Sequence, residues 1–148
     1  MKNKFISFFL IFFLNIFLTI SVFANEQFNF NVTEIEILDE GNKIIGSKGG
    51  TVTSTDGIII NAETFVYLKT ENILNAKGSV VIEDKTNDYK FYSEEIKNKK
   101  NDEIIFTNGD TKSKIYSRYD FDSNDTLFFV NEKVLKSTNK TKSLRVSL

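Results

Sequence analysis

The chain has 148 residues with 19 basic and 20 acidic side chains, and it contains neither histidine nor cysteine. Without those two residue types, a Ser-His-Asp or Cys-His catalytic arrangement cannot be built, so no enzyme is expected. The near balance of charges offers no basic surface that would gather nucleic acid, which excludes a nucleic-acid partner.

The first 24 residues have the layout of a secretory signal peptide. Lys2 and Lys4 precede a nearly continuous apolar run, Phe5–Phe23, and Ala24 supplies the small residue of a cleavage site. We therefore expect residues 1–24 to be removed. The run is nearly long enough to span a bilayer, so an uncleaved anchor is the alternative. In both cases the remainder of the chain is exported.

The exported part is predicted to be built from short strands. Residues 28–32 and 35–37 alternate apolar and polar side chains, and a period of two is typical of a half-buried strand. Glycine recurs downstream at turn-like intervals, as in Asp56-Gly57, Lys77-Gly78 and Asn108-Gly109. This pattern predicts one all-β domain over residues 25–131. Residues 132–148 are expected to form a last strand or a basic linker tail.

An internal repeat organises the middle of the chain. The separation from Glu63 to Glu94 is 31 residues, and the separation from Gly78 to Gly109 is also 31. A weaker third copy begins at Tyr116, at an offset of 23. We interpret each unit as a strand, a polar turn, a second strand and a glycine turn. Stacked units of this kind bury one continuous core.

The apolar phase also changes within a unit. Ile58 and Ile60 share one parity, whereas Phe65 and Tyr67 share the other. Because side chains alternate strictly between the faces of a strand, this change requires a bulge or corner near residues 62–64, and the same argument applies near residues 93–95. Strands bent in this way fold a sheet over on itself. A sandwich, a jelly roll and a β-solenoid are the architectures that remain.

Residues 120–125 imitate the start of a calcium-binding loop. However, Asp125 stands where the sharp turn of such a loop needs glycine, and Glu132 lies one residue beyond the position of the bidentate ligand. A polar hairpin turn is the better interpretation. No metal and no cofactor are expected.

Three segments resemble the OstA-like domain of lipopolysaccharide-transport proteins: the opening at residues 28–35, the run at residues 56–67, and the run at residues 73–80. The resemblance covers residues 28–131 and is greatest to the N-terminal periplasmic domain of the outer-membrane lipopolysaccharide-assembly protein. In this family the domain also occurs as a stand-alone periplasmic bridge protein, and both forms are alternatives here.

The resemblance implies a V-shaped β-jelly roll of repeated antiparallel bent strands. It implies a groove that shelters the acyl chains of lipid A, and sheet edges that dock to other lipopolysaccharide-transport proteins. It also implies a location in the periplasm, in association with the outer membrane. The function implied is therefore non-enzymatic lipopolysaccharide transport.

Under this resemblance, lipid contacts the inward apolar face of the sheets. The residues expected on that face are Ile35, Ile37, Ile60, Phe65, Tyr67, Val80, Ile82, Phe91, Ile96 and Phe106. The alternative is an exported structural or adhesive β-repeat protein, in which these residues fill a closed core without lipid affinity. The alternation itself fits both, because a packed sandwich and an open groove both place apolar side chains inward.

Overall fold

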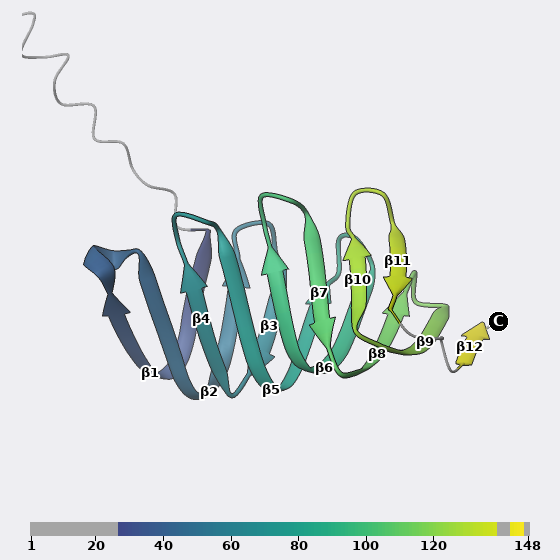
Figure 1. The fold of residues 1–148 in the computed structure, drawn as a ribbon, viewed down its shortest axis with the longest axis horizontal. Coiled ribbons are helices and arrows are strands. Elements are labelled where there is room, and N and C mark those ends of the chain that lie inside the picture. The colour runs from purple at the N-terminus through teal and green to yellow at the C-terminus, as the bar shows by residue number, and fades with distance from the viewer. Residues whose placement is uncertain (1–26, 139–142, 147–148) are drawn as a thin grey trace, which may run out of the picture.

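The structure, a computed structural model, describes residues 27–138 and 143–146 (Figure 1). The predicted signal peptide lies outside these residues. Within the described part, no helix has the length and apolar character needed to cross a membrane.

The described residues form twelve strands, which are joined in one antiparallel sheet, and one short 3-10 helix. In chain order these are β1 (Phe28–Leu38), η1 (Asp39–Gly41), β2 (Lys43–Ser54), β3 (Ile59–Ala62), β4 (Thr64–Leu68), β5 (Ile73–Asp84), β6 (Tyr89–Lys99), β7 (Ile104–Asn108), β8 (Asp110–Ile115), β9 (Tyr119–Asn124), β10 (Thr126–Phe129), β11 (Val134–Ser137) and β12 (Ser143–Val146). The all-β fold of bent antiparallel strands is confirmed. Residues 132–148, expected as a strand or a tail, contain β11 and β12.

The sheet is doubled over into two layers because four long strands pass from one layer to the other (Figure 1). For example, β2 pairs with β4 through its first part and with β3 through its last part. The front sheet of Figure 1 holds β4, β7, β10 and β11, and the back sheet holds β3, β8, β9 and β12. Strands β1, β2, β5 and β6 contribute one part to each sheet.

The strands bend along a common line, which we call the crease. The ladder of β5 and β6 shifts register between Lys77 and Val80, opposite Glu94. Strand β3 ends before Glu63, and strand β4 begins after it. The corners predicted near residues 62–64 and 93–95 are therefore confirmed. The predicted glycine turn at Gly78 is wrong, because this residue lies inside β5 at the crease.

The third repeat is also corrected. Glu63, Glu94 and Asp125 all lie at corners between the two sheets, at a constant spacing of 31 residues, so the offset of 23 was wrong. Residues 120–124, predicted as a polar hairpin turn, belong to strand β9. The corner follows them at Asp125, where the backbone amide bonds to the carbonyl oxygen of Gly109 at 3.2 Å.

The hydrophobic core lies between the two sheets. Its cluster, with the partly buried residues packed against it, extends from Phe28 to Leu135. Large side chains such as Phe65, Phe91 and Phe128 are fully buried. Residues 25–148 contain every described strand and the whole of this core, so we expect them to fold without residues 1–24.

Candidate functional site

The two sheets present apolar side chains toward each other in continuous rows. Residues that face one another in an antiparallel ladder share one face of the sheet. One row of the front sheet therefore joins Ile37, Ile44, Tyr67 and Leu74 across four strands. The adjacent row begins at Ile35 and runs through Gly46, Phe65, Ala76 and Ile96. These rows form the inner face of the front sheet.

Seven of the ten predicted inward residues are buried in the core, each at most 3% exposed. They are Ile60, Phe65, Tyr67, Val80, Ile82, Phe91 and Ile96. The structure brings them together between the two sheets. Whether they contact lipid stays a prediction.

Ile35 and Ile37 share the inner face but are 54% and 62% exposed. They lie on β1, the edge strand, so no further strand of the described chain flanks them on one side. The rows that are buried in the middle of the molecule therefore emerge into solvent at this edge, which we call the open edge. It is the exposed continuation of the core.

The prediction that Phe106 points inward is wrong. Phe106 pairs with Lys97 and Leu127, and these three partly or largely exposed residues lie on the outer face of the front sheet. Its neighbour Ile105 takes the inward position and is fully buried. In the run Ile104-Ile105-Phe106 every residue is apolar, so alternation could not distinguish the two faces.

Aromatic rings join the sheets across the interior. At the open edge, Phe28 of the back sheet meets Tyr67 of the front sheet edge to face, with ring centroids 4.8 Å apart. Further along, Phe128 of the front sheet packs against both Tyr89 and Phe91 at 5.2 Å. The interior is thus closed by packed side chains away from the open edge.

Turns of the two sheets face each other on the side opposite the crease, which we call the mouth. Two lysines from front-sheet turns cross it. Lys100 pairs with Asp56, and the Nζ of Lys133 donates to the Oδ1 of Asn87 at 2.7 Å. Partial burial disfavours ionisation of Asp56, but hydrogen bonds from Lys100 and Ser54 and the charge of Lys100 outweigh it. The pKa of Asp56 is therefore lowered below 3.8.

Buried Asp84 holds the turn that presents Asn87. One carboxylate oxygen accepts the backbone amides of Thr86 and Asn87, each at 2.9 Å, and the other accepts the Asn87 side-chain amide at 2.7 Å. Nearby, burial raises the pKa of Tyr89, and the Asp84 charge adds to this effect, so the phenol stays protonated. The mouth is therefore bridged by polar groups with fixed positions.

Hydroxyl groups fill the interior near the crease at the C-terminal end. Thr107 and Thr111 share a hydrogen bond of 2.7 Å, Thr111 donates to Ser93 at 3.3 Å, and Ser123 bonds to Thr126 at 2.6 Å. All five residues are buried. The apolar interior therefore does not continue to this end, a feature that the predicted apolar stripe did not include.

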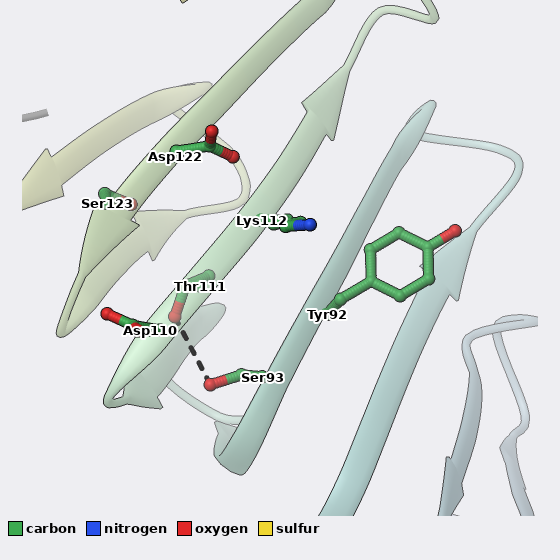
Figure 2. Close-up of a pocket in the computed structure, with 7 residues that line it drawn as sticks. All are labelled: Tyr92, Ser93, Asp110, Thr111, Lys112, Asp122 and Ser123. Atoms are coloured by element: carbon green, nitrogen blue, oxygen red, sulfur yellow. Dashed lines mark hydrogen bonds between the residues drawn. The ribbon is translucent and has the colours of Figure 1, made fainter. Parts of the chain in front are cut away.

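A depression of about 390 Å³ lies on the back sheet (Figure 2). Strands β6, β8 and β9 supply its walls, which are Tyr92, Ser93, Asp110, Thr111, Lys112, Asp122 and Ser123. Tyr92 is 43% exposed, and Lys112 is its ladder partner, so this part of the wall belongs to the outer face. A wall with one lysine and two carboxylates does not suit an acyl chain, and the depression shares no residue with the open edge.

The two bent sheets define an LptA-like β-jelly roll. The structure superimposes with a TM-score of 0.69 on the crystal structure of LptH, described as "the LptA homologous periplasmic component of the conserved lipopolysaccharide transport device from Pseudomonas aeruginosa". The match covers 82% of this chain and 94% of that chain at 11% sequence identity, a level at which it shows the fold alone. No protein-family model and no curated protein matches the sequence.

Proposed function

We propose that this chain is a non-enzymatic, periplasmic component of lipopolysaccharide transport that shelters acyl chains on its inner apolar face. The observation that carries the proposal is the emergence of the core rows at the open edge, where Ile35 and Ile37 stand exposed. Singly scattered apolar residues are common on protein surfaces, whereas contiguous exposed apolar surface marks a binding site. The fold shared with LptH, a component of such a transport device, supports the same role.

Acyl chains enter at the open edge under this proposal. Each buried CH₂ group contributes about 0.8 kcal/mol, so a short contact with several chains already gives useful affinity. Deeper insertion separates the two sheets and has to break the aromatic contact between Phe28 and Tyr67. The crease then acts as the hinge, and the bridges at the mouth oppose the separation.

The same edge docks other transport domains. Strand β1 has a partner on one side only among the described residues, and it is 11 residues long. Such an edge offers unpaired backbone groups to a strand of a neighbouring protein. Docking there would continue the inner apolar rows into the partner, so that acyl chains pass from one domain to the next without meeting water.

The packed interior favours a second candidate, a structural or adhesive β-repeat protein with a closed core. Phe65, Phe91 and Phe128 are at most 1% exposed, which is what such a core requires. In that case Ile35 and Ile37 serve only to pair β1 with a neighbouring chain, and no lipid affinity is expected.

Native mass spectrometry of residues 25–148 with lipopolysaccharide distinguishes the two candidates. Ile37→Glu places a charge on the open edge without burying it, and Tyr116→Glu, at a turn residue that is 45% exposed, is the matched control. Saturable binding that is lost in Ile37→Glu and kept in Tyr116→Glu supports the transport role. Absence of binding to the wild-type protein, or equal binding by both variants, refutes it.

A further inference from the structure

The outer faces of the two sheets differ in chemistry. On the back sheet, ladder partners on the outer face carry charges of both signs, as in Lys112 beside Asp122 and Lys114 beside Asp120. Such a face is typical of a surface that meets water. The front sheet departs from this pattern.

Apolar side chains occupy two neighbouring rows on the outer face of the front sheet. In β7, β10 and β11 they are Ile104, Phe106, Leu127, Phe129 and Val134. None of these five belongs to the core cluster or packs against it, and Val134 is 37% exposed. They form an apolar patch on the outer face of the front sheet, on the side opposite the interior. The front sheet is the layer nearer the viewer in Figure 1. The fold does not need this patch for its core.

A smaller set extends the patch toward the N-terminus. Ile45, Val66, Leu68 and Ile73 lie on the same face in β2, β4 and β5, and all four are partly exposed. Together the two sets span six strands. Lys97 and Lys99 of β6 lie between the two sets in these rows. Partly exposed apolar residues gathered in this way on one face mark a surface that meets another apolar phase.

Lysines are interspersed with these apolar residues. Lys43, Lys97, Lys99 and Lys136 belong to the same two rows, whereas Glu36 is the acidic residue in them. The Nζ of Lys136 lies 4.8 Å from the ring centre of Phe129. The Nζ of Lys99, at the end of β6, lies 3.8 Å from the Oδ2 of Asp102. These two rows are therefore both apolar and basic.

We propose that this outer face of the front sheet docks onto the surface of an anionic lipid bilayer. Apolar and aromatic side chains enter the interfacial region, while lysines extend past them to the head groups, and the two contributions add. A second copy of this chain is a poor occupant. Packing two such faces together would oppose one set of lysines to another, which costs free energy. The proposal requires no lipopolysaccharide and so does not depend on the function proposed above.

Flotation of residues 25–148 with lipid vesicles tests the proposal. Vesicles of phosphatidylcholine with phosphatidylglycerol are compared with vesicles of phosphatidylcholine alone, at low and at high salt. We expect binding to the anionic vesicles that weakens at high salt, because salt screens exposed charges. The variant Lys97→Glu/Lys99→Glu should bind them at least about tenfold more weakly, since each lysine near an anionic surface contributes to the attraction.

The back sheet provides matched controls. Lys112→Glu/Lys114→Glu reverses two charges at the same spacing on one strand of the opposite outer face, and Tyr92→Ser removes an exposed ring there. Both should bind like the wild type, whereas Phe106→Ser/Phe129→Ser should lose most of the binding. Circular dichroism and thermal unfolding verify that each variant is folded. Equal loss in the two lysine pairs, equal binding to both vesicle types, or no binding by the wild type overturns the proposal.

Discussion

The backbone amide of Glu63 donates to the carbonyl oxygens of Lys77 and Gly78, at 3.1 and 3.2 Å, and so fastens the corner between β3 and β4 to the bend of β5. Gly78 has a φ of +86°, and a Cβ placed on it would lie 2.6 Å from the Oε2 of Glu63 and 2.8 Å from its Cβ. The crease therefore requires a residue without a side chain at this position.

Gly78→Ala should lower the free energy of unfolding by more than Gly57→Ala does. Gly57 has a similar φ of +93°, but an added Cβ there meets nothing within 4 Å. The positive φ alone costs about 1–2 kcal/mol in both variants. The contact with Glu63 should add about 1 kcal/mol or more in Gly78→Ala. Urea unfolding followed by circular dichroism measures both losses, and equal values would contradict the close packing at the crease.

The corners could be predicted because a change of apolar parity is visible in the sequence. The position of Gly78 could not, since a glycine with positive φ serves a turn between strands and a bend within one equally well. The third corner at Asp125 was missed for another reason. Its inward neighbours Ser123 and Thr126 are hydroxyl residues that bond to each other, so no apolar phase change marks the bend.

The candidate site was predicted in part. Alternation indicates which face a side chain takes, and this sufficed for Phe65 and Phe91. It does not report what lies beyond the edge of a sheet, so the exposure of Ile37 became evident only from the topology. Phe106 was assigned inward from a run in which every residue is apolar, whereas its neighbour Ile105 fills the space between the sheets.

Replacement of Phe91 and of Phe106 by alanine should have very different effects. Phe91 is fully buried, with its ring 5.2 Å from that of Phe128, so Phe91→Ala should cost about 3–5 kcal/mol of stability. Phe106 faces outward, and Phe106→Ala should cost about 1 kcal/mol or less. Denaturant unfolding measures both. Equal losses would place Phe106 in the core and reverse its assignment to the outer face.

The hydroxyl of Thr107 should contribute to stability through the chain of hydrogen bonds near the crease. It accepts the backbone amide of Thr126 at 3.0 Å and bonds to the hydroxyl of Thr111 at 2.7 Å. Thr107→Val keeps the shape but leaves this buried amide without its partner, which should cost about 1–3 kcal/mol. Thr107→Ser retains the hydroxyl and is the control for Thr107→Val, so it should cost less stability. If valine is tolerated better than serine, packing rather than hydrogen bonding determines this position.

Acid should weaken the bridge across the mouth. The pKa of Asp56 in the folded protein lies below its usual value of 3.8, so the folded state favours the carboxylate. The resulting stabilisation is fully present above about pH 3.8, and it is lost as the pH falls through the folded pKa. Asp56→Asn cannot titrate. The unfolding free energy of the wild type should therefore fall more steeply than that of Asp56→Asn below this pH.

A double-mutant cycle assigns this effect to the bridge. The side chain of Lys100 is only 10% exposed, whereas that of Asp56 is 46% exposed and partly screened by water. Lys100→Met removes the cation. Asp56→Asn should therefore change the pH dependence of stability less in the Lys100→Met background than in the wild type. Unfolding free energies of the four proteins, measured from acidic to neutral pH, test this. An undiminished difference in the Lys100→Met pair would mean that Ser54, which also bonds to Asp56, holds the carboxylate without help from Lys100.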